Sequence, residues 1–451
     1  MEMKSHIFGT DGIRSEANRY PMTPEIALQI GKALVLSIKR HSGKKKILIG
    51  KDTRLSGYIF ETALTSGICS MGADVLLTGP LPTAAISHLT KSMDTDAGIM
   101  ISASHNPAHD NGFKFFDSEG FKYNNHLEEK IDKIISTEIQ GVKSDQLGKA
   151  YRVEDAGSRY VEFAKQTADN ISLDGLRVVL DCANGAAYHV GPKAISELGA
   201  EVILMNTSPN GSNINKNAGV FYTEPIIKKV LETKADLGAI LDGDADRLII
   251  IDEKGKILDG NALLAIAAIY NKKMGILTKD TVVATVMANM GFKKLMHSEG
   301  IKVHETAVGD KYVSETLKIN GYSLGGEPSG HMMFSDLTAS ADGIVATLKI
   351  LEIMKNERKK LSELNKYKTY PQILINKIVK AKPPIEKLSK TQSAIKKGKE
   401  ELRDSGQILV RYSGTEELAR VMVEGQSTSQ IKRIAEKIAG VMEREINSGQ
   451  K

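Results

Sequence analysis

A loop with two serines follows a short apolar stretch near residue 100. Residues 97–100 (AGIM) have the composition of a buried strand, and residues 101–107 (ISASHNP) follow them directly. The Asn-Pro pair predicts a turn, but a turn does not account for two hydroxyl groups and an imidazole at the end of a strand. A serine hydroxyl presented in this way can act as a nucleophile in group transfer.

Three aspartates alternate with small residues in a second loop. Residues 241–248 (LDGDADRL) place Asp242, Asp244 and Asp246 directly after another apolar run. Carboxylates so close repel one another unless a cation lies between them, and oxygen ligands favour Mg²⁺, then Mn²⁺ or Ca²⁺. The calcium-binding loop of an EF-hand begins with the same spacing of aspartates, but it requires glycine at the position of Arg247. The remaining alternative to a metal-binding loop is an acidic turn exposed to solvent.

Two further loops carry polar side chains suited to a phosphorylated sugar. Residues 324–331 (LGGEPSGH) predict a polar hairpin whose Glu327, Ser329 and His331 match the hydroxyl groups of a sugar, with an ordinary glycine-rich turn as the alternative. Residues 411–420 (RYSGTEELAR) suit an anion: two arginines can bind phosphate oxygens and a glycine lets backbone N–H groups approach. The residues of this anion loop are Arg411, Ser413, Gly414, Thr415 and Arg420.

Basic residues occur early in the chain as well. Arg14 ends GTDGIR, Arg54 ends GKDTR, and Lys114 lies in NGFKFF; each is also interpretable as an ordinary surface charge. Dinucleotide, P-loop and α/β-hydrolase motifs are absent from the sequence. Serine, metal, polyol and phosphate chemistry together indicate phosphoryl transfer through a phosphoserine.

The elements that position these loops repeat along the chain. Residues 46–79, 177–206 and 281–307 each contain a strand, a polar loop, a helix and a second strand, with glycine after the helix. Such βαβ units predict mainly parallel sheet. We expect three related α/β domains and a smaller C-terminal α+β domain. The expected domains are 1–150 with the serine loop, 151–254 with the acidic loop, 255–368 with the sugar loop, and 369–451 with the phosphate loop.

Composition limits the partners. The 451 residues are 41% hydrophobic and 5% aromatic with no Trp, and 61 basic against 55 acidic residues give a net charge of +6. This excess is too small to indicate a nucleic-acid partner. Two cysteines, the absence of a signal-peptide pattern and the absence of long apolar runs predict a cytoplasmic chain without membrane contact.

The four loops, in this order, resemble the α-D-phosphohexomutase family, above all its amino-sugar branch. GTDGIR, ISASHNP, DGDADR, GGEPSGH and RYSGTEELARVMVEG carry the resemblance over the whole chain. It implies four domains around a central cleft.

Residue by residue, the resemblance places the family's phosphoserine on Ser104, so that Ser102 is a neighbour. The metal ligands fall on Asp242, Asp244 and Asp246 with a phosphoserine oxygen, and one Mg²⁺ per chain is implied. Sugar contacts fall on Glu327 and Ser329. The remaining implied site residues are Arg14 and the proton-transfer candidates Lys114 and His331, together with Arg247, Arg411, Ser413, Gly414, Thr415 and Arg420.

Several positions depart from the family's usual pattern. They are Ser15, Ala245, Pro328, Tyr412 and Glu417. None removes a ligand, but Pro328 lies between two sugar-contacting residues and therefore bears on which hexose is bound.

The resemblance implies interconversion of glucosamine 6-phosphate and glucosamine 1-phosphate through a sugar bisphosphate, which is both intermediate and activator, on the route to UDP-N-acetylglucosamine and cell-wall precursors. A monomer or a homodimer is expected. Within the family, the alternative is a mutase acting on mannose or glucose phosphates. Outside it, the alternatives are a metal-dependent phosphatase that works through phosphoserine and a non-catalytic sensor of sugar phosphates.

Overall fold

The structure is a computed structural model that describes residues 7–9, 12–38, 43–169, 171–412 and 417–448. The chain divides into two compact units. The larger comprises residues 1–287 and 300–366, and the smaller comprises residues 288–299 and 367–451. No helix in the described ranges is long and apolar enough to cross a membrane.

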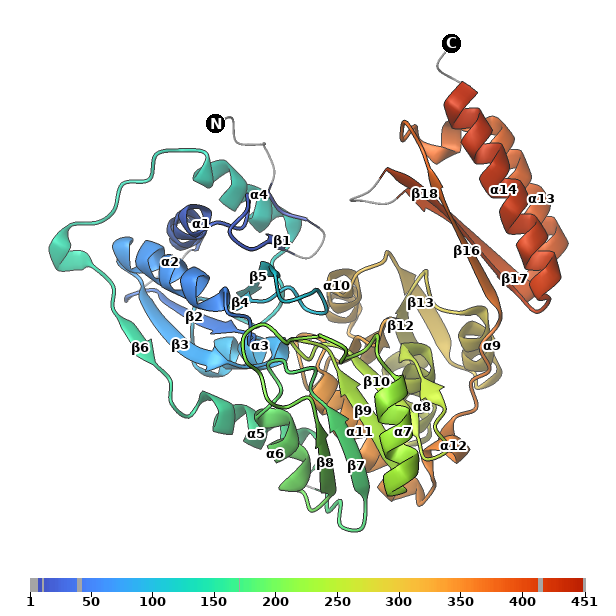
Figure 1. The fold of residues 1–451 in the computed structure, drawn as a ribbon, viewed down its shortest axis with the longest axis horizontal. Coiled ribbons are helices and arrows are strands. Elements are labelled where there is room, and N and C mark those ends of the chain that lie inside the picture. Colours follow the sequence, from blue (N-terminus) through green and yellow to red (C-terminus); the bar gives the residue numbers. More distant parts are fainter. Residues whose placement is uncertain (1–6, 10–11, 39–42, 170, 413–416, 449–451) are drawn as a thin grey trace. The chain divides into compact units, whose positions relative to one another are not determined.

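The first sheet of the larger unit has the strand order β1-β5-β4-β2-β3-β6 (Figure 1). Its strands are β1 (Ile13–Glu16), β2 (Lys46–Lys51), β3 (Asp74–Pro80), β4 (Ala97–Ile101), β5 (Asp110–Asp117) and β6 (Ala150–Arg152). The accompanying helices are α1 (Pro24–Ser37), α2 (Gly57–Ser70), α3 (Thr83–Ser92) and α4 (Asn125–Ile135). The strands β2, β3, β4 and β6 pair in parallel, whereas β5 runs antiparallel to both of its neighbours.

Both faces of this sheet are buried because helices cover both of them. Ile47 and Ile49 of β2 pack in one core with α1, α2 and α4. Alternate residues of a strand point to opposite faces, and on the other face Gly50 lies against Ile86 of α3, where any larger side chain would collide. The continuous apolar composition of β2 and β4 follows from this two-sided burial.

The second sheet has the order β11-β10-β9-β7-β8 and the third has the order β13-β12-β14-β15. The second group of elements is β7 (Arg177–Asp181), β8 (Glu201–Met205), β9 (Leu237–Leu241), β10 (Leu248–Asp252) and β11 (Ile257–Leu258), with α5 (Ala156–Thr167), α6 (Val190–Ser196) and α7 (Glu224–Thr233). The third is β12 (Thr281–Thr285), β13 (Lys302–Thr306), β14 (Leu324–Gly326) and β15 (Met332–Phe334), with α8 (Gly260–Lys273), α10 (Asp310–Asn320), α11 (Gly343–Glu357) and α12 (Leu361–Leu364).

The smaller unit contains an antiparallel sheet of order β16-β18-β17. Its elements are β16 (Gln372–Ile378), β17 (Gly406–Tyr412), β18 (Leu418–Gly425), α9 (Met290–Ser298), α13 (Ser389–Leu402) and α14 (Thr428–Ser448). Helices α13 and α14 share an apolar core with the sheet. Helix α9 joins this unit although it connects β12 to β13: Asn289 exchanges two hydrogen bonds with Tyr370, and Glu424 accepts the Met290 N–H.

The mixed, mainly parallel α/β sheets and the smaller α+β unit confirm the predicted fold class. The pairs β2–β3, β7–β8 and β12–β13 are parallel, as the three repeats require. Gly72, Gly199 and Gly300 have φ values of 82°, 100° and 68°, the left-handed conformation predicted after each helix.

Candidate active site

The serine loop begins where β4 ends and turns sharply at Ser104. Ser104 has a φ of 52°, a conformation that only glycine adopts without strain. Its side chain is buried and its Oγ donates to Asp242 Oδ2 at 2.6 Å. The Ser102 hydroxyl instead donates to Asp52 at 2.7 Å and accepts the Ser104 N–H at 2.9 Å. Of the two serines, Ser104 therefore presents its hydroxyl to the acidic loop.

The acidic loop connects β9 to β10, so no helix flanks it and it is not an EF-hand. One carboxylate oxygen from each of Asp242, Asp244 and Asp246 lies within 4.8 Å of the others, and all three residues are buried. Asp244 Oδ1 is buried without a hydrogen-bond partner among the described residues. Because a buried, unpaired carboxylate oxygen is costly, this set of donors fits a hard dication.

Lys114 brings a positive charge into the same loop from β5. Its Nζ lies 2.7 Å from Asp244 Oδ2 and 2.7 Å from Asp246 Oδ2, and its side chain is 2% exposed. Thr83 also donates to Asp244 Oδ2, at 2.6 Å. The interpretation of Lys114 as a surface charge is therefore wrong: the lysine connects the first sheet to the acidic loop.

Asp242 and Asp246 differ in their tendency to ionise. Burial, and then the charges of Asp246 and Asp244, raise the pKa of Asp242 to about 7. Burial also opposes ionisation of Asp246, but the charges of Lys114 and His331 hold the pKa of Asp246 well below its usual range. A cation beside the loop would favour the ionised form of Asp242 near neutral pH.

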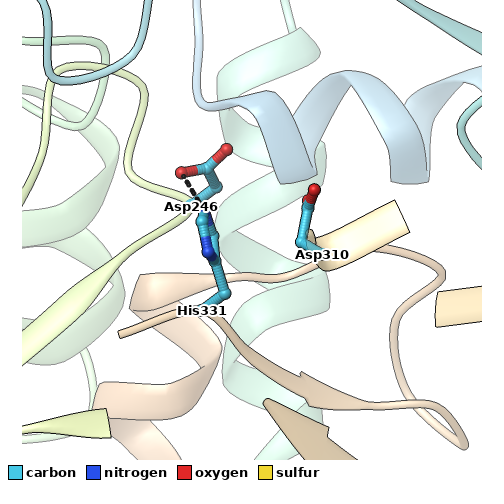
Figure 2. Close-up of side chains that lie close together, drawn as sticks. All are labelled: Asp246, Asp310 and His331. Atoms are coloured by element: carbon cyan, nitrogen blue, oxygen red, sulfur yellow. Dashed lines mark ion pairs between the residues drawn. The ribbon is translucent and has the colours of Figure 1, made fainter. Parts of the chain in front are cut away.

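The sugar loop is a hairpin between β14 and β15 that places His331 beside the acidic loop. His331 Nε2 lies 3.3 Å from Asp246 Oδ1, the ion pair drawn in Figure 2. Its Nδ1 lies 3.0 Å from Glu327 Oε2 and 3.1 Å from Ser329 Oγ. The hairpin therefore carries its three polar side chains as one connected group.

Arg247 follows the third aspartate and adds a second cation beside His331. Its Nε lies 3.2 Å from His331 Nε2. Burial, and less strongly the charge of Arg247, lower the pKa of His331. The neighbouring carboxylates of Asp246 and Glu327 outweigh both effects and raise the pKa to about 10. Protonated His331 can donate to Asp246 and Glu327 together.

Asp310, at the start of α10, lies near Asp246 and His331, and we did not predict it from the sequence (Figure 2). Its Oδ2 accepts from Lys122 Nζ at 2.6 Å in a buried ion pair. The preceding Gly309 donates its N–H to Glu327 Oε1 at 3.0 Å. An acidic residue in the first turn of a helix is common, so the sequence carried no signal for Asp310.

Arg14 lies in β1 opposite Gly112 of β5, at the edge of the first sheet. Its charge reaches the serine loop: burial, and then Arg247 and Arg14, lower the pKa of His105 to about 4.

Two of the predicted phosphate-binding residues lie in the smaller unit. Arg411 of β17 and Arg420 of β18 are direct cross-strand partners. Burial, and then the charge of Arg420, lower the pKa of Arg411. Adjacent like charges favour binding of an anion. Ser413, Gly414 and Thr415, also predicted here, lie outside the described residues.

Comparison with known families accounts for nearly the whole chain. Four domain families of phosphoglucomutase/phosphomannomutase match it. They are alpha/beta/alpha domain I at residues 5–141, domain II at 158–255, domain III at 259–370 and the C-terminal domain at 374–441. The chain belongs to the phosphoglucomutase/phosphomannomutase family, whose members are phosphohexomutases and therefore isomerases.

Similar proteins extend over the full length. The chain is 49% identical over 450 residues to phosphoglucosamine mutase of Syntrophotalea carbinolica, with 98% of each chain covered. It is 47% identical over 457 residues to phosphoglucosamine mutase of Bdellovibrio bacteriovorus, with 99% of this chain and 100% of the relative covered.

Solved structures share the fold. A phosphoglucomutase/phosphomannomutase family protein from Burkholderia thailandensis superposes with a TM-score of 0.82 at 22% identity, covering 98% of both chains. N-acetylphosphoglucosamine mutase of Aspergillus fumigatus, solved in complex with GlcNAc-6P and magnesium, has a TM-score of 0.68 at 18% identity, covering 98% of this chain and 96% of that one.

Proposed function

We propose that the chain is a phosphoglucosamine mutase, which interconverts glucosamine 6-phosphate and glucosamine 1-phosphate in the cytoplasm and so supplies the synthesis of UDP-N-acetylglucosamine and cell-wall precursors. The observation that carries the chemistry is the Ser104 hydroxyl at 2.6 Å from Asp242 in a buried triplet of aspartates. Glucosamine as the sugar is supported by the relatives, which are 47–49% identical over nearly the whole chain.

Phosphorylated Ser104 donates its phosphoryl group to the free hydroxyl of the bound sugar phosphate. The bond between Ser104 Oγ and phosphorus breaks while a sugar oxygen bonds to phosphorus, which yields a sugar bisphosphate. The bisphosphate then reorients in the site, and its other phosphoryl group is transferred to Ser104. Lys114 and His331 carry the proton that leaves or rejoins the reacting hydroxyl, and both lie beside the acidic loop.

The remaining side chains bind and orient. Asp242, Asp244 and Asp246 would hold Mg²⁺, which offsets negative charge at the transferring group when bound. Glu327 and Ser329 accept and donate hydrogen bonds to sugar hydroxyls in either of two orientations. Arg411 and Arg420, with Ser413, Gly414 and Thr415, hold the phosphate that is not reacting, and Arg14 and Arg247 add positive charge. Exclusion of water from phosphorylated Ser104 prevents loss of its phosphate.

One assay tests the function and its alternatives. The purified chain, primed with glucosamine 1,6-bisphosphate, is supplied with glucosamine, glucose or mannose 6-phosphate, with and without Mg²⁺. We expect Mg²⁺-dependent isomerisation that is fastest with glucosamine 6-phosphate. Faster turnover of glucose or mannose phosphate would reassign the substrate, and release of inorganic phosphate without isomerisation would indicate a phosphatase.

A further inference from the structure

Arg54, which the sequence left open as a surface charge, is completely buried behind the serine loop. It follows β2 and is 0% exposed. All five N–H groups of its guanidinium find an acceptor. These acceptors are Asp52 Oδ2 at 2.8 Å and the backbone carbonyls of Ser104 at 2.9 Å, Asn106 at 2.8 Å, Asp110 at 3.0 Å and Pro107.

Four of the five acceptors are carbonyls of the segment that carries Ser104. A guanidinium holds its donors in one rigid plane, so the four carbonyls must converge on it. A buried cation is stable only when it is fully paired and hydrogen-bonded, and here the backbone of the loop supplies most of those bonds. The conformation of the loop and the burial of Arg54 are therefore mutually dependent.

A second connection runs from Arg54 to the Ser104 backbone through Asp52. The Asp52 carboxylate binds Arg54 and accepts the Ser102 hydroxyl, and Ser102 in turn accepts the Ser104 N–H. The Ser104 peptide is thus held on both sides: its N–H by Ser102, and its carbonyl by Arg54 and by Asn215 Nδ2 at 2.9 Å.

These contacts address a specific difficulty. Ser104 adopts a φ of 52°, which is unfavourable for a residue with a Cβ and persists only where the surroundings enforce it. If the peptide relaxed, the Oγ would leave Asp242 and the acidic triplet. Phosphoryl transfer depends on alignment, and errors of about 1 Å in position are costly.

We propose that Arg54, acting with Asp52 and Ser102, is a positioning residue for phosphoryl transfer, which holds Ser104 in its left-handed conformation with Oγ toward the acidic triplet. This inference rests on the proposed function. It predicts that loss of the hydrogen bonds among Arg54, Asp52 and Ser102 lowers kcat. The Michaelis constant for the sugar phosphate should stay nearly unchanged, because we assign none of these side chains to sugar binding.

Ser102→Ala is the first test, because it removes a single hydroxyl and leaves Arg54 and Asp52 paired. Steady-state kinetics with glucosamine 6-phosphate should show kcat reduced about tenfold, as expected for one lost hydrogen bond to the nucleophile's backbone. The Michaelis constant should stay within about twofold. Rapid-quench measurement of phosphoryl transfer from Ser104 to the sugar should show the same reduction in rate.

Arg54→Lys is the stronger test. Lysine keeps the charge but offers three donors from one atom, so it cannot bind the four carbonyls and Asp52 together. We expect kcat to fall about 100-fold, again with little change in the Michaelis constant. If this variant does not fold, Ser102→Ala decides the question alone.

Glu61→Gln is the matched control. It weakens another buried ion pair of the first domain, between Lys51 Nζ and Glu61 Oε2 at 2.5 Å. Among the described residues, neither of these side chains forms a hydrogen bond with residues 102–110. It should destabilise the domain yet retain kcat within about twofold. A reduction in kcat that follows thermal stability equally in all three variants, or unchanged kcat in Ser102→Ala, would overturn the proposal.

The unaltered chain separates this inference from the function on which it rests. If it shows neither phosphate on Ser104 nor isomerisation, the proposed function is wrong. If it isomerises normally while Ser102→Ala and a folded Arg54→Lys do so equally well, only the positioning role is refuted.

Discussion

At the scale of single residues, the acidic triplet shows how position changes the chemistry of one side-chain type. Burial, and then the charges of Asp246 and Asp244, raise the pKa of Asp242 to about 7. Burial opposes ionisation of Asp246 too, but the charges of Lys114 and His331 hold its pKa well below its usual range. Asp244 retains one buried oxygen without a hydrogen-bond partner among the described residues. This unpaired oxygen, within a cluster of three buried carboxylates, fits the binding of a dication.

Asp244→Asn tests the role of that oxygen. Replacing the carboxylate with an amide removes a charge and places an NH₂ group among the ligands, so we expect the apparent affinity for Mg²⁺ to fall about 10- to 100-fold. This affinity is measured by isothermal titration calorimetry with Mg²⁺ and by enzymatic activity as a function of Mg²⁺ concentration. Full activity of the unaltered chain after treatment with EDTA would contradict the proposed metal site.

Sequence reasoning at this scale found the residues whose types are unusual at the end of a strand. Ser104 and the three aspartates stood out because apolar strands rarely end in such groups. Arg54 and Asp310 did not stand out, because a lone arginine or a helix-start aspartate is common. Their importance comes from burial and from partners far along the chain, which composition cannot reveal.

At the scale of elements, the close approach of two loops depends on Gly243. A Cβ at this position would lie 2.6 Å from the Ser104 carbonyl oxygen and 2.8 Å from Asn215 Nδ2. That carbonyl cannot withdraw, because Arg54 and Asn215 bind it. The absence of a side chain therefore lets the acidic loop lie against the serine loop.

We predict that Gly243→Ala separates the two loops and lowers kcat about 100-fold. Circular dichroism should show a folded chain, because the displacement is local. Gly175→Ala is a suitable control, since a Cβ at Gly175 meets no atom within 4 Å, although its φ of 84° makes the substitution strained. Equal kcat values for Gly243→Ala and the control would show that the close approach is unimportant.

A second element-level feature is the start of α11, where Asp342 caps the helix. Its Oδ1 accepts the N–H groups of Ile344 and Val345, and the buried Tyr160 of α5 donates to its Oδ2 at 2.8 Å. Burial raises the pKa of Asp342 from 3.8 to about 6, against the lowering effect of these hydrogen bonds.

This shift predicts a pH dependence of stability. Between pH 3.8 and about 6 the folded state retains a proton on Asp342 that the unfolded state releases, so the free energy of unfolding falls as pH rises through this window. The roughly two-unit shift corresponds to about 3 kcal/mol. Asp342→Asn keeps the capping oxygen but does not titrate, so its unfolding free energy should lose this component of the pH dependence.

Urea unfolding from pH 4 to pH 7 measures the effect. Asp259→Asn is the control, because Asp259 caps α8 in the same way but is only half-buried. In the Asp259 variant, the free energy of unfolding should change with pH as it does in the unaltered chain. In the Asp342 variant, it should fall less steeply between pH 4 and about 6. A slope unchanged by Asp342→Asn would refute the assignment.

At the scale of the whole molecule, the sequence predicted the fold class from repeated βαβ patterns, because local periodicity and glycines after helices determine those units. It gave no sign that α9, between two strands of the third sheet, groups with the smaller unit. That grouping depends on Asn289 and Glu424, whose hydrogen bonds to distant backbone follow no local pattern. The domain boundaries near 150, 255 and 368 stay predictions.

Arg411 and Arg420, for which we propose a role in phosphate binding, lie in the smaller unit. Their substitution therefore tests binding separately from the chemistry at Ser104. We predict that Arg411→Ala raises the Michaelis constant for glucosamine 6-phosphate about tenfold or more, because a charge-assisted phosphate contact is lost. Phosphate already on Ser104 should remain, as intact-mass measurement can show. Lys397→Ala, on the exposed surface of α13, is the control; an equal effect there would indicate non-specific charge.

Transfer through Ser104 can be followed with one labelled phosphoryl group. Enzyme carrying ³²P is mixed with unlabelled glucosamine 6-phosphate and Mg²⁺, and the peptides and sugars are then separated. We expect the label to start on the peptide containing Ser104 and to appear in glucosamine phosphates within one turnover. Label on a different residue, or its release as inorganic phosphate, would contradict this expectation.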